Sequence, residues 1–494
     1  MTFVNTFFSS EKGLVLFLLV LLLYHFACMF QPHMGLFYDE AYYAHWAESF
    51  SLGYYSKPPV VAWVIKVTTS LFGNTDWSVK LGSPILYTAS SWIVFKIGNH
   101  LFDKKVGLLA SLIFASTPII GFNSLFITTD APLLFFWSLS VYLFLLVSIK
   151  DSWQLWMALG VSIGLGMLSK YTFFTLPLGF VLYVFLVRDH AVFINSKAWC
   201  AALLACAIFS LNMYWNSQHD FISLLHTREI AKIESSGVKI LAFFGFIFSQ
   251  IAIFGILVFV VSIFSLNRIS ERYKERSVWV FLVCITLPIL ALVSSQALFT
   301  RAFVNWAAPF VVGASLISAA LLVRLRSRYW VSAVAFNHVI LILFFHWPFV
   351  LLTLGVEESN KNSPYFRLSG WESFSDKVHA VLVEKSRIEP TTLVSVDRNV
   401  LAYFGHYSGY NLAQLYFWNR DRSNIRNHYD LVNDLEHLRG RAAHFVSNKP
   451  ISREVEESFE RVRFISKVSY ELSPEIQRAV YLYEVEGFKG YVDI

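Results

Sequence analysis

Residues capable of acid–base and phosphate chemistry gather in the segment that follows the first long apolar run. Asp39 and Glu40 are adjacent acids, and Lys57 lies further along the same polar segment. A carboxylate can accept the proton of an attacking hydroxyl, and a cation can stabilise a departing phosphate. The combination therefore suits transfer of a group from a phosphate leaving group to a hydroxyl, with Asp39 as base and Lys57 as phosphate partner.

Further polar residues occur where other apolar runs begin or end. Arginine can grip two phosphate oxygens at once, so Arg301 is a second candidate for a phosphate contact. The remaining residues of this kind are Asp130, Lys170, Trp215, Asn216, His219 and Asn305. If these loops share one side of a membrane, their carboxylates, cations and amides indicate a single site there.

Each candidate also has a structural explanation. Asp39 and Glu40 could simply begin a helix, because acids favour the first helical turn. Lys57 and Lys170 could be interface lysines whose stems lie along apolar surface. Asp130 could cap the helix that Pro132 begins. Capping and catalysis are compatible at that position. His219 could equally be an ordinary loop residue.

The composition indicates a membrane protein. Of 494 residues, 56% are hydrophobic and only 15% are charged, where soluble domains carry about 25% charged residues. Apolar runs at 13–30, 131–149, 240–266 and 329–354 are each about as long as the ~20 residues that cross hydrocarbon. Because such runs recur as far as residue 354, a single cleaved signal peptide does not explain them.

Hydropathy predicts about eleven membrane spans. Their approximate centres are residues 21, 88, 113, 140, 160, 180, 207, 253, 287, 313 and 341. With the N-terminus inside, the inner loops at 103–105, 188–197, 268–276 and 324–328 carry Lys and Arg, as the positive-inside rule expects. An odd number of spans then places the candidate residues and everything after Leu354 outside. The net charge of +6 follows from these loops and needs no nucleic acid.

Residues 37–73 should not cross the membrane. Asp39, Glu40, Glu48, Lys57 and Lys66 all lie there, and a charged side chain at the bilayer centre costs about 2.5–3.5 kcal/mol. The aromatic spacing over 39–50 predicts an amphipathic helix at the outer interface, followed by a turn and a short helix after Pro59.

The segment after Leu354 has a different composition. Twenty of the 34 acidic residues fall there, and short runs at 392–396, 443–447, 462–468 and 479–485 are typical of strands. The predicted fold class is thus a polytopic α-helical membrane protein with a C-terminal soluble α/β domain. The predicted domains are 1–354, a transmembrane catalytic domain with the amphipathic outer loop 37–73, and 355–494, an α/β domain on the outer side of the membrane.

Several of these segments resemble a known family. The run Tyr38-Asp39-Glu40-Ala41-Tyr42-Tyr43, followed by Gly53-Tyr54-Tyr55-Ser56-Lys57-Pro58-Pro59, resembles the first outer loop of the protein O-mannosyltransferase superfamily of C-type glycosyltransferases. The likeness is greater to its bacterial branch, which includes the aminoarabinose transferases of lipid A. Further matches are Thr128-Thr129-Asp130-Ala131-Pro132, Leu168-Ser169-Lys170-Tyr171, Trp215-Asn216 with His219, and Arg301 with Asn305-Trp306. The resemblance covers residues 10–354.

This resemblance implies a role for each matched residue. Asp39 would be the catalytic base, with Glu40 beside it and Asp130 as a further acid near the site. Lys57, Arg301 and Lys170 would contact the carrier phosphate. The candidates for acceptor or loop contacts are Trp215, Asn216, His219 and Asn305. The implied reaction is a single displacement with inversion, using undecaprenyl-phosphate-sugar and neither a metal nor another cofactor.

The implied partners are a polyprenyl-phosphate-sugar donor, the lipid bilayer and an envelope acceptor. Lipid A or core oligosaccharide is the first acceptor expected, and a secreted protein is the second. The implied location is a bacterial inner membrane, with the site on the periplasmic face. The alternative functions are a transporter or flippase of lipid-linked sugar, which predicts broken helices with charges at mid-membrane depth, and an inactive scaffold of the same fold.

Overall fold

The computed structural model describes residues 10–189, 191–230, 237–266, 273, 275–389 and 391–491. Most of the inner loop predicted at 268–276, and residue 190 of the loop at 188–197, lie outside these described residues. The chain forms two compact units. The helical unit contains 1–28, 57–61 and 80–345, and the mixed unit contains 29–56, 62–79 and 346–494.

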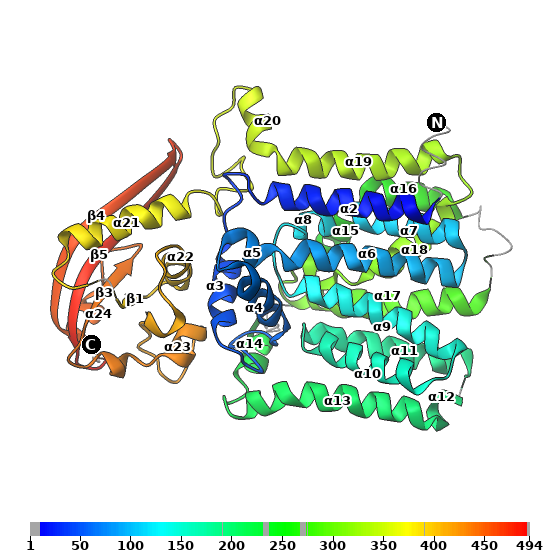
Figure 1. The fold of residues 1–494 in the computed structure, drawn as a ribbon, viewed down its shortest axis with the longest axis horizontal. Helices are drawn as coiled ribbons and strands as arrows, with labels where there is room; N and C mark the ends of the chain where they lie inside the picture. Colours follow the sequence, from blue (N-terminus) through cyan, green and yellow to red (C-terminus); the bar gives the residue numbers. More distant parts are fainter. Residues whose placement is uncertain are drawn as a thin grey trace. The chain divides into compact units, whose positions relative to one another are not determined.

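The helical unit is a bundle whose long helices run side by side in Figure 1. Their apolar sequences suit a bilayer, where a helix satisfies its own backbone hydrogen bonds. The longer helices are α2 (Glu11–Cys28), α6 (Gly82–Leu101), α7 (Lys104–Ser116), α9 (Asp130–Ile149), α10 (Trp153–Met167), α11 (Thr175–Val187), α13 (Ser196–Ser217), α15 (Ile240–Phe254), α17 (Arg276–Phe299), α18 (Phe310–Leu322) and α19 (Ser327–Phe345). Shorter elements are α8 (Pro118–Asn123), η1 (Tyr171–Phe174), α12 (Ala191–Ile194), α14 (Ile222–Ile230), α16 (Ile256–Phe264) and η4 (Val304–Ala307).

Every predicted span centre lies within one of these helices. Among the described residues, five helices are long and apolar enough to cross a membrane: α2, α9, α13, α17 and α19. The bent pair α15–α16 would be a sixth. Helices α10, α18 and the segment 171–187 are apolar but shorter. The structure therefore shows a protein with several membrane-crossing helices, at a number below the predicted eleven by length and composition alone.

The bend between α15 and α16 has a local cause. The two helices meet at 94° at Gly255, which has a φ of +110°. A Cβ at this glycine would lie 2.3 Å from the side-chain nitrogen of Asn337 on α19. Only glycine adopts this φ without strain, and only glycine leaves room for Asn337. The sequence pattern 240–266 therefore forms two helices where it predicts one continuous span.

The mixed unit contains a five-stranded sheet in the order β2-β1-β3-β5-β4. The strands are β1 (Leu393–Ser395), β2 (Leu415–Phe417), β3 (Ala442–Ser447), β4 (Phe459–Ser473) and β5 (Ile476–Phe488). β1 is parallel to β2 and β3, whereas β5 is antiparallel to β3 and β4. The core beneath the sheet includes Val394, Leu435, Phe445, Val485 and Phe488. All four predicted strand runs overlap observed strands, and β2 is an additional strand.

The helices of the mixed unit come from both ends of the chain. They are α3 (Tyr38–Glu48), most of α4 (Val60–Phe72), α5 (Asp76–Lys80) up to residue 79, α20 (Trp347–Thr353), α21 (Trp371–Lys385), α22 (Arg398–Tyr407), α23 (His428–Val432) and α24 (Arg453–Glu457), with the short helices η5 (Leu412–Gln414) and η6 (Leu435–Leu438). The helix predicted at 39–50 is therefore α3, and the helix predicted after Pro59 is α4.

The surroundings of α3 differ from those of an interfacial amphipathic helix. Every residue from 40 to 47 is buried, so α3 has no exposed polar face along this stretch. Its closest helical neighbour is α22, from the C-terminal part of the chain. Aromatic spacing alone predicts one apolar face, but the residues of α3 from 40 to 47 are all buried.

Candidate active site

The predicted site residues are divided between the two units. Asp39 and Glu40 belong to the mixed unit. The other eight belong to the helical unit: Lys57, Asp130, Lys170, Trp215, Asn216, His219, Arg301 and Asn305. Each group has its own geometry.

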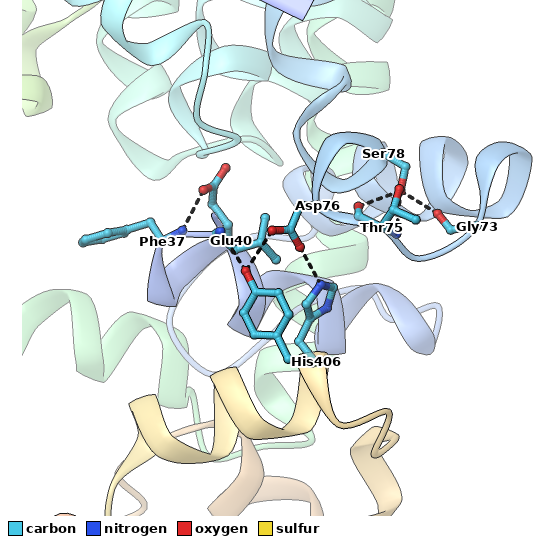
Figure 2. A network of polar contacts seen from close by, with 9 residues as sticks. Phe37, Glu40, Gly73, Thr75, Asp76, Ser78 and His406 are labelled. Carbon is cyan, nitrogen blue, oxygen red and sulfur yellow. Dashed lines mark hydrogen bonds and ion pairs between the residues drawn. The ribbon is translucent and has the colours of Figure 1, made fainter. Parts of the chain in front are cut away.

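Glu40 fixes the beginning of α3. Its side chain is buried at 1% exposure, and its Oε2 accepts a hydrogen bond of 2.9 Å from the backbone N–H of Phe37 (Figure 2). A carboxylate in this position satisfies a backbone donor that the helix leaves unpaired. The structural explanation for Glu40 thus has direct support, and Glu40 holds the turn that carries Asp39.

Asp39 is the more accessible of the two acids. Its side chain is 33% exposed, and its Oδ1 accepts a hydrogen bond of 3.3 Å from Nη2 of Arg398 on α22. The guanidinium of Arg398 also lies over the rings of Tyr42, at 4.9 Å, and Tyr38, at 5.2 Å. Burial opposes the positive charge of Arg398, but the neighbouring carboxylate and tyrosines outweigh it and raise its pKa. A permanently charged arginine therefore orients the Asp39 carboxylate.

Buried polar and aromatic contacts anchor α3 within the mixed unit. The hydroxyl of Tyr42 accepts a hydrogen bond from the backbone N–H of His428, and Nδ1 of His45 lies 2.8 Å from the hydroxyl of Tyr429. Trp46 stacks on Tyr54 at 4.8 Å between ring centroids. Burial, together with the nearby side chains of His406 and His428, lowers the pKa of His45 to about 3. His45 is therefore neutral in the folded protein at physiological pH.

A second polar network in the mixed unit is centred on Asp76, the first residue of α5 (Figure 2). Its carboxylate accepts a hydrogen bond of 2.8 Å from the Tyr407 hydroxyl and lies 3.1 Å from Nε2 of His406. The Tyr407 oxygen in turn accepts a hydrogen bond of 3.0 Å from the N–H of Leu36. Burial and the Asp76 carboxylate raise the pKa of Tyr407. This network ends one residue before Phe37, at the start of α3.

In the helical unit, Asp130, Lys170 and Asn305 form one buried cluster. Nζ of Lys170 lies 2.6 Å from Oδ1 of Asp130, and Nδ2 of Asn305 donates to Oδ2 at 2.7 Å. The Asp130 side chain is 1% exposed and that of Lys170 is 11% exposed. The capping position of α9 belongs to Thr129, and the Asp130 carboxylate points to Lys170 and Asn305 instead. The structure thus brings together three predicted residues, from the start of α9, the loop between α10 and η1, and η4.

This cluster limits what Lys170 can do. The Asp130 carboxylate balances its charge, so a phosphate must compete with Asp130 for the ammonium group. Removing either partner would leave the other charge buried, which is costly. The cluster therefore suits positioning of the surrounding loops as well as binding of a phosphate.

The segment of Lys57 is fixed close to the same loop. After the Pro58-Pro59 turn, the N–H of Val60 donates to the carbonyl of Leu168 at 3.2 Å. Leu168 precedes Lys170 by two residues, so the backbones of the two lysine-bearing segments are joined. Lys57 itself is half-buried.

Asn216 belongs to a closed hydrogen-bond network. It is fully buried on α13, its Nδ2 donates to the Asn212 carbonyl at 2.9 Å, and its Oδ1 accepts from Ser223 at 2.6 Å. The Tyr171 hydroxyl lies 3.0 Å from Oδ1 of Asn212 and 2.7 Å from Oγ of Ser223. This network joins α13 and α14 to the residue after Lys170, so Asn216 positions that loop.

Trp215, His219 and Arg301 are the more accessible candidates. Trp215 and His219 stack at 4.1 Å with 15° between their rings, and Nδ1 of His219 lies 2.8 Å from the Trp215 carbonyl. Arg301 is exposed, and its guanidinium lies 4.4 Å from the ring centroid of Phe303. The exposed guanidinium of Arg301 is available to an anion.

Sequence reasoning missed Arg398, Asp76, His406 and Tyr407. Arg398 lies 359 residues from Asp39 in the sequence, and a single sequence carries no signal that pairs them. The sequence could have indicated Asp76, because this residue begins a short polar stretch next to the predicted outer loop. A rule that follows polar residues just after predicted strands would also have found Arg398, which comes soon after β1.

The fold and part of the sequence are similar to those of known proteins. The chain shares its fold with ArnT from Cupriavidus metallidurans, with a TM-score of 0.66 over 95% of this chain and 97% of that one, at 15% identity. The ArnT structure bound to undecaprenyl phosphate gives a TM-score of 0.65 at 13% identity. Residues 56–215 match the dolichyl-phosphate-mannose-protein mannosyltransferase family. The predicted resemblance to the C-type glycosyltransferase superfamily is thereby confirmed.

Two curated relatives narrow the comparison. The lipid A galacturonosyltransferase RgtD of Rhizobium johnstonii is 27% identical over 288 residues, which are 58% of this chain and 60% of that protein. The undecaprenyl phosphate-α-4-amino-4-deoxy-L-arabinose arabinosyl transferase 1 of Pseudomonas fluorescens is 24% identical over 132 residues, covering 25% of this chain and 24% of that protein. The matches thus span less than two thirds of the length of each relative, 60% of the first and 24% of the second.

Proposed function

We propose that the chain is an inverting glycosyltransferase that moves a sugar from a polyprenyl-phosphate carrier to an envelope acceptor on the periplasmic face of a bacterial inner membrane. The main support is the family match over residues 56–215, which contain Lys57, Asp130 and Lys170, on a chain with the ArnT fold. The similarity to a lipid A galacturonosyltransferase and to an undecaprenyl phosphate-aminoarabinose transferase favours undecaprenyl phosphate as carrier and lipid A as acceptor.

In this proposal Asp39 accepts the proton of the acceptor hydroxyl. The hydroxyl oxygen forms a bond to the anomeric carbon, the bond from that carbon to the carrier phosphate breaks, and polyprenyl phosphate leaves. Arg398 holds the carboxylate in position through the 3.3 Å contact. If the acceptor group is a phosphate, which is already ionised, Asp39 orients it instead of deprotonating it.

The phosphate of the carrier meets the cations of the helical unit. Lys57 and the exposed Arg301 bind the departing phosphate oxygens. Lys170 contributes from the buried cluster, where Asp130 and Asn305 set its position. Trp215, Asn216, His219 and Asn305 shape the loops around the donor or acceptor. The reaction as proposed uses no metal or other cofactor.

The proposed topology has eleven spans within residues 1–354 and places 355–494 in the periplasm. Among the described residues, five helices and the bent pair α15–α16 qualify by length, and α10, α18 and the segment 171–187 are shorter apolar helices, which gives up to nine. The proposed number also counts α6 and α7, which contain the predicted centres 88 and 113, and requires that short helices cross at a locally thin or polar-lined site.

One observation favours the alternative of a transporter or flippase. The 94° break between α15 and α16 resembles the discontinuous helices of transporters, and it faces the buried amide of Asn337. The comparisons favour the transferase. A flippase would move the intact carrier-linked sugar across the membrane without breaking the sugar–phosphate bond.

Label transfer tests the proposal. Membranes containing wild type, Asp39→Asn or Asp376→Asn would receive radiolabelled undecaprenyl-phosphate-sugar with endogenous lipid A and envelope proteins. Asp376 is an exposed residue of α21 and provides a matched control. We expect label in an acceptor fraction for wild type and Asp376→Asn, and a loss of about 100-fold or more for Asp39→Asn. Absence of transfer by wild type with several donors contradicts the proposal, and full activity of Asp39→Asn removes Asp39 from it.

A further inference from the structure

A large pocket lies entirely within the mixed unit, and none of the predicted catalytic residues lines it. Its volume is about 980 Å³, at the upper end of the roughly 300–1,000 Å³ typical of small-molecule sites. Segments 29–35, 74–77 and 368–373 form most of its wall, which is completed by Pro348, Glu358, His406, Tyr407, Tyr470 and Leu472. Three distant parts of the sequence thus meet around one cavity.

The polar lining of this pocket favours some ligand charges over others. Three carboxylates line it, those of Asp76, Glu358 and Glu372, and no lysine or arginine is among its lining residues. The side chains of Gln31 and Asn74 add amide groups. Such a wall accepts hydrogen bonds from hydroxyls and attracts ammonium groups, whereas it repels phosphates and carboxylates. The carrier phosphate of a donor lipid is therefore a poor occupant.

The aromatic lining indicates the shape of the ligand. Trp77, Trp371, Tyr407 and Tyr470 all contribute to the wall. Trp371 is held rigidly, because Tyr403 stacks on it at 3.9 Å and the guanidinium of Arg478 lies 4.3 Å from its ring centroid. Flat apolar rings beside hydrogen-bond acceptors match a sugar, which presents apolar C–H faces and a rim of hydroxyls.

We propose that this pocket binds an uncharged or cationic saccharide portion of the acceptor. That the ligand is the acceptor rests on the transferase activity proposed above, whereas binding of a saccharide does not. Asp76 and Tyr407 line the pocket and also reach Leu36 through hydrogen bonds of 2.8 and 3.0 Å. An occupant that contacts Asp76 and Tyr407 therefore contacts the network that leads to the start of α3, and Asp39 lies in the first turn of that helix.

Three disaccharides of different charge test the binding. The purified full-length protein in detergent would be titrated by calorimetry with a glucosamine disaccharide, its N-acetylated neutral form and digalacturonate. We expect the cationic and neutral sugars to bind and digalacturonate to bind much more weakly. Failure of all three to bind, or equal binding of digalacturonate, overturns the proposal.

Charge reversal at the rim separates this pocket from adventitious binding. Glu372 and Glu384 are both exposed residues of α21, but only Glu372 lines the pocket. Glu372→Lys should weaken the glucosamine disaccharide about twofold to fivefold and strengthen digalacturonate similarly. Glu384→Lys should change neither. Identical behaviour of the two variants overturns the assignment.

An activity measurement then separates this inference from the proposed function. In the transfer assay, Glu372→Gln should raise the KM for the acceptor more than it lowers kcat, and leave the KM for the donor unchanged. Glu384→Gln should leave all three unchanged. Transfer by wild type that Glu372→Gln does not change would contradict the proposed role of the pocket but not the proposed function. Saccharide binding without any transfer would contradict the proposed function but not saccharide binding in the pocket.

Discussion

At the scale of single residues, the predicted site residues differ in how strongly hydrogen bonds and ion pairs fix their side chains. The Glu40 carboxylate accepts a hydrogen bond from the backbone N–H of Phe37. The Asp39 side chain is 33% exposed and contacts Arg398. Asp130 and Lys170 are paired and buried. An exposed, oriented carboxylate suits a base that must meet a substrate, so Asp39 remains our catalytic candidate, with Glu40 and Asp130 in supporting positions.

The buried ion pair leads to a prediction about stability. Lys170→Met leaves the Asp130 carboxylate buried, with a hydrogen bond from the Asn305 amide but without the lysine charge, and should destabilise the protein by about 3–5 kcal/mol. Lys170→Met combined with Asp130→Asn removes both charges and should recover much of that loss. The unfolding midpoint in detergent measures the effect. A single variant as stable as wild type would show that the pair contributes nothing.

His45 leads to a prediction about pH. Its pKa in the folded protein is about 3 and its ordinary value is 6.5, so the unfolded chain binds the extra proton first as pH falls. The contribution of neutral His45 is complete above pH 6.5 and is lost between pH 6.5 and 3, at up to about 1.4 kcal/mol per pH unit. The groups that face it are His406, His428 and Tyr429.

The test compares unfolding midpoints of wild type and His45→Gln from pH 4 to pH 7. Wild type should lose stability on acidification more steeply than His45→Gln, although the variant starts lower because it weakens the contact with Tyr429. Parallel curves for the two proteins would contradict the assignment.

At the scale of elements, α3 joins the chemistry to the fold of the mixed unit. Its first turn carries Asp39 and Glu40, and its buried body contacts α22 and α23 through Tyr42, His45 and Trp46. The C-terminal part of the chain thus supplies Arg398 to the candidate base and the surface on which α3 rests. The candidate base Asp39 and its partner Arg398 thus both belong to the mixed unit.

The break between α15 and α16 gives a prediction at this scale. Gly255→Ala forces a φ of +110° on a residue with a Cβ and brings that Cβ against the Asn337 amide. We expect a loss of about 1–3 kcal/mol in stability, seen as a lower unfolding midpoint. The loss should be smaller in an Asn337→Ala background, where the steric conflict is absent but the strain persists. An equal loss in both backgrounds would contradict contact with Asn337.

The parts of the fold that depend on local pattern could be predicted from the sequence. The apolar periodicity placed the helix centres, and alternating runs placed four of the five strands. β2 has three residues, as β1 does, but it was missed because no β-branched residues flank it as Thr392 and Val396 flank β1. The bend at Gly255 was missed because it depends on a positive φ and on a neighbour in α19, neither of which the hydropathy of 240–266 reveals.

The candidate site was predictable only in part. Asp130, Lys170 and Asn305 were selected separately as polar residues at the ends of apolar runs, and the structure brings these three together. The pairing of Asp39 with Arg398 and of Asp76 with Tyr407 joins residues more than 300 positions apart. A single sequence, taken alone, contains no information about such pairs. Burial of α3 was missed for the same reason.

At the scale of the whole molecule, the proposal depends on topology. Arginine and lysine in the predicted inner loops, together with the proposed odd number of spans, predict that Lys105 lies inside and α21 outside. In a background without Cys28, Cys200, Cys206 and Cys284, a membrane-impermeant maleimide should label Glu384→Cys in intact spheroplasts. It should label Lys105→Cys only after the membrane is permeabilised. Labelling of both positions from the same side would contradict an odd number of spans between inner N-terminus and outer tail.

The most direct test of the account is a transfer reaction with purified components. Wild-type protein in proteoliposomes would receive radiolabelled undecaprenyl-phosphate-sugar and lipid A, and the label in lipid A and in released carrier would be followed together. The account predicts that label enters lipid A, or another added envelope acceptor, as undecaprenyl phosphate appears in equal amount. Movement of the intact donor across the bilayer, with no broken sugar–phosphate bond and no labelled acceptor, would contradict it and favour a flippase.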